Sequence, residues 1–212
     1  LCLWGCGGNS LSVNDTVQGQ WVWALPANFP IPRVPVENPM NEAKIELGRF
    51  LFYDRRLSGN GTQACASCHH QDKAFTDGRV VALGSTGESH PRNAQGLANV
   101  VYNATLTWAN PSLLSLEAQA QVPLFGDAPV EMGVHDGNIT EVLARIANDT
   151  RYVSLFAAAY PGVNPAISWG NITRAIASFQ RTLISGNSKY DQFLQGKAVL
   201  SESERRGLDL FN

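Results

Sequence analysis

The chain has 212 residues, 44% of them hydrophobic, and its 16 basic side chains nearly balance 18 acidic ones, giving a net charge of −2. This length can build one sizeable hydrophobic core, the ordinary content of a single domain. A charge so close to zero argues against nucleic acid and against an anionic membrane surface as partners, and it favours a small molecule or another protein.

The first residues resemble the end of a bacterial signal peptide. Leu3-Trp-Gly-Cys6 is similar to a lipobox, in which Cys6 would be acylated after cleavage, although Trp4 is an unusual residue there. The alternative is an apolar terminus that is not processed. Residues 7–20 have the Gly-, Ser- and Asn-rich composition of a flexible tether. We therefore expect an exported protein that resides in the periplasm and is anchored by lipid if Cys6 is processed.

Residues 21–40 are predicted to form an extended arm, because they contain five prolines among apolar side chains. After the arm, apolar residues at three- and four-residue spacing predict a helix over residues 41–53. Residues 57–137 then lack a sustained periodicity. Such a long irregular segment is unusual in a compact domain and indicates that a large buried cofactor organises it.

Helical patterns return in the last third of the chain. Asn138 and Glu141 match a capping box at the start of a helix with an apolar face. Three further helices are predicted over residues 150–159, 168–184 and 188–195. Ser201 and Glu204 form a second capping box, which opens a helix that we expect to continue past Asn212. The pattern as a whole predicts an all-α fold.

Cys65-Ala-Ser-Cys68-His69 matches the signature of covalent c-type haem attachment. Two thiols three positions apart can each bond a vinyl group, and the adjacent imidazole can bind the iron. A zinc site is an alternative, but His70, His90 and His135 lack the spacing of zinc ligands. A thioredoxin-like dithiol would need a strand before the motif, which residues 57–63 do not offer. Since simple electron-transfer cytochromes carry the same signature, the motif predicts haem without fixing an enzyme class.

Four further segments surround this motif: Leu47-Gly-Arg-Phe-Leu-Phe-Tyr-Asp54, Arg56-Leu-Ser58, Ala74-Phe-Thr-Asp-Gly78 and Pro91-Arg-Asn93. In this order they resemble the N-terminal half of bacterial di-haem cytochrome c peroxidases and their MauG-like relatives. The arm sequence Trp-Ala-Leu-Pro-Ala-Asn-Phe-Pro is similar to a MauG-like branch that includes MbnH-type enzymes. The resemblance covers about residues 21–212.

The resemblance implies an all-α, cytochrome c-like haem domain with long irregular loops and an extended N-terminal arm. It divides the chain into a leader and tether (1–20), the haem domain with its wrapping arm (21–200) and the start of a second haem domain (201–212). The family's second domain carries its own haem. We therefore expect one haem c in this sequence and two in the full-length protein.

The resemblance also implies residues that act on peroxide. Gln119 in Leu-Glu-Ala-Gln-Ala and Glu131 in Val-Glu-Met match pocket residues over the first haem. A carboxylate can move a proton from the near oxygen of H₂O₂ to the leaving one, and an amide can orient the molecule. A surface Glu and a polar helix Gln are the alternative. Trp108 matches a relay between the haems, although the family usually continues Trp-Asp-Gly-Arg and this chain continues Ala-Asn-Pro; a buried packing Trp is the alternative.

Three more residues have implied roles at the cofactors. Arg56 is implied to contact the haem, and Asn93 matches a ligand of a calcium ion between the two haem domains. Without the resemblance, Asn93 would be an ordinary turn residue. His90 lies several positions after the distal histidine of the family, so it could be a distal iron ligand, a pocket base or an exposed loop histidine.

The sequence therefore predicts an oxidoreductase that reduces H₂O₂ with electrons from a small periplasmic redox protein, a cytochrome c or a cupredoxin. One alternative is a MauG- or MbnH-like enzyme that uses H₂O₂ to oxidise residues of a partner protein. Another is a mono-haem electron-transfer cytochrome with the iron capped by Met132 or His90. The family also implies a homodimer, and nothing in the sequence indicates nucleic acid.

Overall fold

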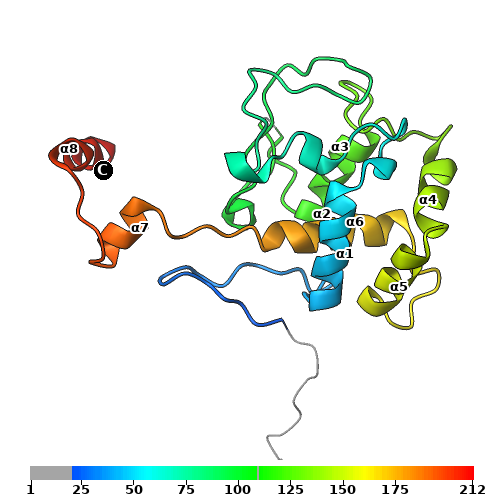
Figure 1. Ribbon diagram of the computed structural model, residues 1–212, viewed down its shortest axis with the longest axis horizontal. Helices are drawn as coiled ribbons and strands as arrows, with labels where there is room; N and C mark the ends of the chain where they lie inside the picture. Colours follow the sequence, from blue (N-terminus) through cyan, green and yellow to red (C-terminus); the bar gives the residue numbers. More distant parts are fainter. Residues whose placement is uncertain (1–20, 109) are drawn as a thin grey trace, which may run out of the picture.

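The computed structural model describes residues 21–108 and 110–212 and confirms the all-α prediction. Within these residues, β-structure is limited to isolated bridges in the loops. Helix α1 (Glu42–Tyr53) and helix α6 (Trp169–Arg181) cross at the centre of the molecule (Figure 1). Their inner faces contribute buried core side chains, namely Leu47, Leu51, Phe52, Ile172, Ile176 and Phe179. The crossing is the core on which the rest of the domain is assembled.

Gly48 allows α1 and α6 to approach each other closely where they cross. A Cβ added at Gly48 would collide with the carbonyl oxygen of Ala175 on α6, which is rigid helix backbone. Gly48→Ala is therefore expected to destabilise the fold by about 3 kcal/mol, because overpacking forces helices apart. Thermal unfolding of the haem-loaded protein should show a melting temperature lower by roughly 6 to 12 °C.

Gly170 provides the matched control for that prediction, since it lies in α6 and nothing surrounds its missing Cβ. Gly170→Ala should leave the melting temperature unchanged or raise it slightly, because alanine favours helix. Equal losses in the two variants would show that the close crossing has no special importance.

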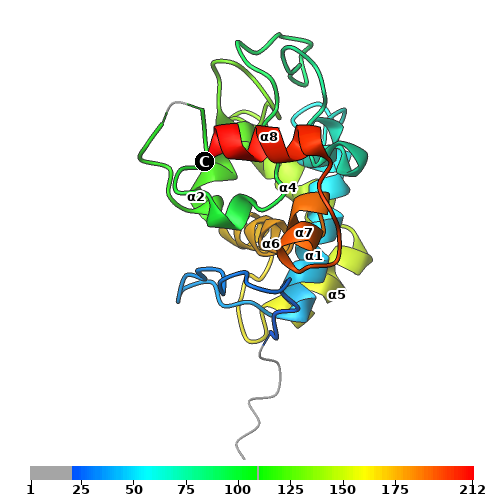
Figure 2. The same ribbon diagram turned by 90° about the vertical axis from the view of Figure 1, so that its left-hand side faces the viewer.

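The predicted helices of the last third are present. They are α4 (Ile139–Ala147), α5 (Thr150–Ala159), α7 (Lys189–Leu194) and α8 (Glu202–Phe211). Helix α5 packs against α1, and α4 packs against α5 and the 3₁₀ turn that follows α1. In Figure 1, α7 and α8 extend away from the helical body, and Figure 2 shows the molecule from the side on which they lie. The capping box at Ser201 is confirmed. The capping box predicted at Asn138 is wrong. The side-chain amide of Asn138 accepts a hydrogen bond from the His135 N–H and donates one to the Gly133 carbonyl, and Glu141 pairs with Arg145.

The arm over residues 21–40 is confirmed as extended chain without helix or strand. It lies against the loop body through Phe29, whose ring meets Tyr102 edge to face at 5.8 Å, and through the Tyr102 hydroxyl, which donates to the Pro30 carbonyl. The arm then enters α1 through Asn41, whose side chain accepts a hydrogen bond from the Lys44 amide at 2.7 Å. The proline-rich segment therefore wraps the domain and leads directly into its core helix.

The long segment after α1 is mostly loop, as predicted, with four 3₁₀ turns at Arg55–Leu57, Cys65–Ser67, Gln71–Lys73 and Val100–Tyr102. It also contains two short helices that the sequence did not predict, α2 (Leu116–Gln119) and α3 (Gln121–Phe125). Over the described residues, no helix has the length and apolar character needed to cross a membrane. Cys6 and the tether lie outside the described residues, and the proposed domain boundaries stay predictions.

Candidate functional site

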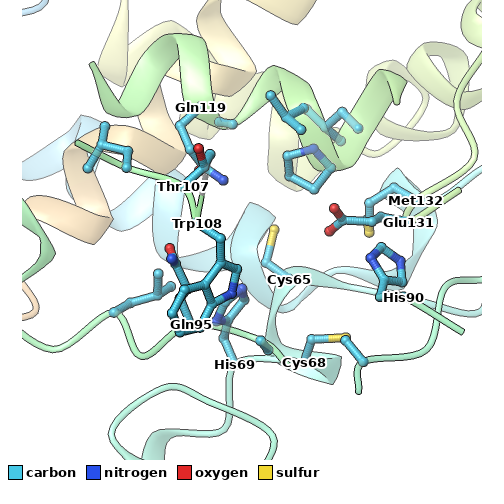
Figure 3. A pocket seen from close by; sticks show the side chains of 18 of the residues that line it. Cys65, Cys68, His69, His90, Gln95, Thr107, Trp108, Gln119, Glu131 and Met132 are labelled. Atoms are coloured by element: carbon cyan, nitrogen blue, oxygen red, sulfur yellow. The ribbon is translucent and has the colours of Figure 1, made fainter. Parts of the chain in front are cut away.

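A cavity of about 470 Å³ lies where α2, α3 and α6 meet the long loop segment. Most of its wall is apolar, formed by Leu97, Val100, Leu106, Leu113, Leu116, Leu124 and Ile176. A smaller set of polar side chains faces the same space from several directions (Figure 3). Apolar walls with a few convergent polar groups are typical of a buried cofactor site.

The haem-attachment motif lies in the wall of this cavity. Residues Cys65–Ser67 form one 3₁₀ turn, and the amides of Cys68 and His69 both donate to the carbonyl of Cys65. This turn places both thiols and the His69 imidazole along the cavity (Figure 3). The two cysteines are not joined in a disulfide.

The thiols and their surroundings argue against the two alternatives to haem. Burial raises the pKa of the Cys65 thiol to about 12, and it also raises the pKa of Cys68. A redox-active dithiol needs a thiolate, which a lowered pKa favours, so the raised pKa values argue against that alternative. Among residues 21–108 and 110–212, no three His, Cys, Asp or Glu side chains gather into a group that could hold a metal ion.

His69 is held in the orientation that iron ligation requires. Its Nδ1 lies 2.7 Å from the carbonyl oxygen of Phe75, which can only accept, so Nδ1 carries the proton and Nε2 is left for a metal. Ala74 and Phe75 have φ angles of 53° and 61°. This left-handed turn brings the Phe75 carbonyl back to the imidazole. Burial lowers the pKa of His69, which favours the neutral, ligating form.

These residues fit a c-type haem. The two thiols can form the thioether bonds, the Nε2 of His69 can bind the iron, and the apolar wall can cover the porphyrin faces. The ring of Phe52 lies 6.3 Å from the His69 ring and joins the motif to the core of α1. The core helix thus supports the residue predicted to hold the iron.

Glu131 and Gln119 both line the cavity, as the sequence predicted. Figure 3 shows Gln119 at the opposite side of the view from His69, and Glu131 beside His90. Burial raises the pKa of Glu131, and the nearby His90 opposes this shift. The backbone here is fixed, because the Glu131 carbonyl accepts from the Ser85 amide and the Met132 amide donates to the Pro123 carbonyl in α3. A surface position for either residue is therefore not what the structure shows.

His90, Asn93 and Trp108 also line the cavity. His90 is only partly exposed, so the structure does not support the exposed-loop alternative. Trp108 is 53% exposed, which contradicts a buried packing role. Its indole Nε1 donates to the Asn93 carbonyl at 3.2 Å, and the Arg92 guanidinium lies 6.0 Å from its ring centre. Trp108 therefore connects the cavity wall with the protein surface.

Arg56 is the one predicted site residue that the structure does not bring to the cavity. Its guanidinium pairs with Asp54 at 2.7 Å and with Asp149 at 3.0 Å, joining the end of α1 to the start of α5. The hydroxyl of Tyr152 completes this surface network by donating to Asp54. Two carboxylates thus hold the charge of Arg56 at the surface, and its contact with the haem stays a prediction.

Several polar residues of the cavity wall were not predicted from the sequence, among them Gln95, Thr107 and Gln180. Gln180 lies on α6, and its buried Oε1 has no hydrogen-bond partner among the described residues. The helical periodicity of α6 had marked its neighbours as core. Periodicity cannot show which buried positions of α6 face a cavity, because this depends on how α2 crosses α6.

Comparison with known proteins agrees with this site. A family model described as di-haem cytochrome c peroxidase matches residues 42–199. Cytochrome-c peroxidase IdrP1 of Pseudomonas sp. (strain SCT) is 37% identical over 210 residues, which cover 96% of this chain and 53% of the relative. Methylamine utilization protein MauG of Methylophilus methylotrophus is 34% identical over 181 residues, covering 84% of this chain and 51% of the relative.

Among solved structures, that of a MauG-like protein associated with microbial copper homeostasis matches with a TM-score of 0.87 and 54% identity. The match covers 90% of this chain and 55% of the other. The chain spans about half the length of the curated relatives it matches. The family model, these relatives and a cavity built around a c-type haem motif together show that the chain belongs to the di-haem cytochrome c peroxidase family.

Proposed function

We propose that the chain is the haem domain of an oxidoreductase that reduces H₂O₂ with electrons from a periplasmic redox protein. The observation that carries this proposal is the placement of Glu131 and Gln119 in the same cavity as Cys65, Cys68 and His69. Electron transfer alone does not need a half-buried carboxylate in the cavity of the haem motif, where partial burial disfavours its charge. A peroxidase needs such a group to move a proton.

The residues of this chain have separable tasks in the proposed reaction. A c-type haem supplies an iron that binds peroxide and exchanges electrons. Glu131 takes the proton from the near oxygen of H₂O₂ and returns it to the leaving oxygen, and Gln119 orients the molecule with its amide. Two electrons and two protons then convert each H₂O₂ into two waters. The bond from His69 Nδ1 to the Phe75 carbonyl leaves Nε2 free, and this nitrogen would bind the iron of a c-type haem.

A second candidate is the H₂O₂-dependent oxidation of residues in a partner protein. The observation that favours it is Trp108, which lines the cavity and is 53% exposed. An indole in this position can pass an oxidising equivalent from the cavity to the surface. The 54% identical solved structure is of a MauG-like protein. The two candidates share the peroxide chemistry of Glu131 and Gln119 and differ in the source of the electrons.

The experiment that tests the proposal mixes the haem-loaded, full-length protein with H₂O₂ in a stopped-flow spectrometer, followed by a reduced cytochrome c or cupredoxin. We expect rapid reaction with H₂O₂ and oxidation of two donor molecules per peroxide. Rapid reaction without donor oxidation would favour the partner-protein candidate. An iron capped by Met132 or His90 that does not react with H₂O₂ would make the protein an electron carrier and refute both candidates.

The raised pKa of Glu131 predicts a pH dependence. Glu131 acts as a base only when it is charged, and burial shifts its pKa upward from the ordinary 4.5. The rate constant for reaction with H₂O₂ should therefore fall as the pH falls through a value above 4.5, and level off at higher pH. Stopped-flow measurements across this range check the prediction. The step should be missing in Glu131→Gln, and a step that persists in this variant would belong to another group.

Several predictions accompany the proposal. We place the protein in the periplasm, with a small redox protein as its donor. Asn93 is proposed as one ligand of a calcium ion, since its amide oxygen is a suitable hard donor. The lipid anchor at Cys6, the second haem and a homodimer are expectations carried by the resemblance to the family.

A further inference from the structure

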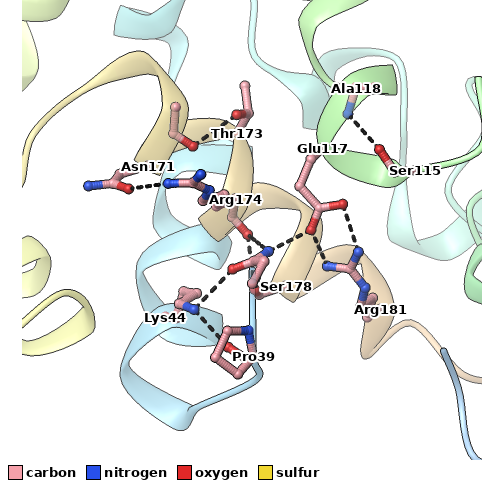
Figure 4. Close-up of polar contacts among 12 residues, drawn as sticks. Pro39, Lys44, Ser115, Glu117, Ala118, Asn171, Thr173, Arg174, Ser178 and Arg181 are labelled. Atoms are coloured by element: carbon pink, nitrogen blue, oxygen red, sulfur yellow. Dashed lines mark hydrogen bonds and ion pairs between the residues drawn. The ribbon is translucent and has the colours of Figure 1, made fainter. Parts of the chain in front are cut away.

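A cluster of polar and charged side chains is buried beneath α2, away from the haem motif (Figure 4). It joins four parts of the chain: the arm, α1, α2 and α6. Its central members are Asn38, Lys44, Glu117 and Arg181. Burying this many polar groups is costly unless each is paired, so their arrangement calls for a physical reason.

Glu117 and Arg181 form the centre of the cluster. Arg181 Nη2 donates to Glu117 Oε2 at 2.8 Å, and Arg181 Nη1 lies 2.7 Å from Glu117 Oε1 in an ion pair without a hydrogen bond among the described residues. These two contacts, one hydrogen bond and one ion pair, form a fork that holds the carboxylate against the guanidinium. Arg181 is 3% exposed, so the pair is shielded from solvent. Burial alone would raise the pKa of Glu117, but the hydrogen bonds from Arg181 and Asn38 hold it below its usual range. Glu117 is therefore charged at neutral pH.

Asn38 connects this pair to the arm. Its Nδ2 donates to Glu117 at 2.6 Å and to the carbonyl of Arg174 at 3.0 Å. Its Oδ1 accepts from the Lys44 ammonium at 2.9 Å, and Lys44 also donates to the Pro39 carbonyl at 2.7 Å. Asn38 is fully buried. The carboxylate of Glu117 thus accepts hydrogen bonds from both the arm and α6, and together these bonds fix its position and orientation.

The helix that carries Glu117 is too short to be stable without tertiary contacts. Helix α2 has four residues, Leu116–Gln119, far fewer than an isolated helix needs for stability. Gln119 follows Glu117 by two positions, which turns it about 200° around the helix. Glu117 therefore points into the cluster while Gln119 points to the other side, into the cavity. Any rotation of α2 about its axis would move both side chains together.

We propose that Glu117, held by Arg181 and Asn38, is a positioning residue that fixes the rotation of α2 and so the direction in which the Gln119 amide enters the cavity. The inference rests on the proposed function, because it takes Gln119 to contact the molecule bound at the iron. A well-packed apolar cluster could stabilise the fold as well as a buried ion pair does. The fork of Arg181 and Glu117 adds a defined angle, which apolar packing does not.

The test reads the environment of the iron-bound ligand without turnover. The full-length, haem-loaded protein is reduced under carbon monoxide, and the infrared stretching frequency of the bound carbon monoxide is recorded. This frequency responds to a hydrogen-bond donor near the ligand. Gln119→Leu removes the donor and identifies the band of this haem. Glu117→Gln keeps the shape of the side chain but removes the charge, so it should shift the same band in the same direction by at least half as much.

Three comparisons decide the result. In the double variant, Glu117→Gln should add nothing to Gln119→Leu, because the two act through one amide. Glu141→Gln, which removes the charge of a 70% exposed glutamate on α4, should leave the band unchanged. Arg181→Lys, which cannot form the fork, is the second variant and should act like Glu117→Gln.

The outcomes separate the inference from the proposed function. If Gln119→Leu shifts the band and Glu117→Gln and Arg181→Lys do not, the positioning role is refuted and the function stands. If Gln119→Leu shifts nothing, Gln119 does not contact the bound ligand and the inference fails, whereas the proposed function is refuted only by a haem that does not react with H₂O₂. A full extra shift from Glu117→Gln in the double variant would overturn the inference. Loss of haem incorporation in both cluster variants would assign the cluster to folding and overturn it equally.

Discussion

Replacing both Cys65 and Cys68 by serine is expected to abolish covalent haem attachment. Serine hydroxyls do not form thioether bonds, and no other cysteine lines the described cavity. Without a haem, the apolar side chains that line the cavity of about 470 Å³ lose the porphyrin surface that they would cover, which removes buried apolar area from the domain. The variant should therefore also lose cooperative thermal unfolding. Intact mass and circular dichroism measure the two effects.

The adjacent histidine gives the control for this variant. His70 does not line the cavity, although it follows His69 directly. His70→Gln should keep covalent haem and a cooperative unfolding transition. If the double serine variant still carried a covalently bound haem after denaturation, the assignment of the motif would be wrong.

Glu131→Gln is expected to slow the reaction with H₂O₂ by a factor of about 10² to 10⁴, the usual contribution of a positioned general base. The amide keeps the size of the carboxylate, so haem content and thermal stability should change little. Stopped-flow kinetics of the haem-loaded protein measure the loss. Removing the base affects only the proton transfer, because the motif that holds the haem is separate.

Glu46→Gln is the matched control, since Glu46 is 53% exposed on α1 and does not line the cavity. It should react with H₂O₂ at the rate of the unmodified protein. An unchanged rate in Glu131→Gln would remove Glu131 from the mechanism and leave the proton transfer to another group, of which His90 is the nearest candidate in the cavity.

The helices that could be predicted from sequence are those with a long apolar face. The helix predicted over 41–53 is found at Glu42–Tyr53, and the one predicted over 150–159 is found at Thr150–Ala159. The two short helices α2 and α3 were missed, because four or five residues are too few to show a period. Their position is set by tertiary contacts such as the fork between Glu117 and Arg181.

The candidate site also has a part that local sequence patterns reveal and a part that depends on tertiary contacts. The haem motif could be recognised from local spacing, because its three ligating groups lie within five residues of each other. The cavity wall combines residues from α2, α3, α6 and the loop, which no local pattern connects. Glu131 and Gln119 were identified only through the family resemblance. The contact of Arg56 with the haem was also implied by that resemblance and stays a prediction, since its contacts in the structure are the two carboxylates of Asp54 and Asp149.

The most direct measurement is the number of haems per chain in the full-length gene product, made with c-type maturation machinery. Intact mass gives the number of covalently attached groups, and the pyridine haemochrome spectrum gives the haem concentration. We expect two haems, one of them on the peptide that contains Cys65 and Cys68. A single haem would contradict the di-haem enzyme, and a protein without haem on Cys65 and Cys68 would contradict the proposed site itself.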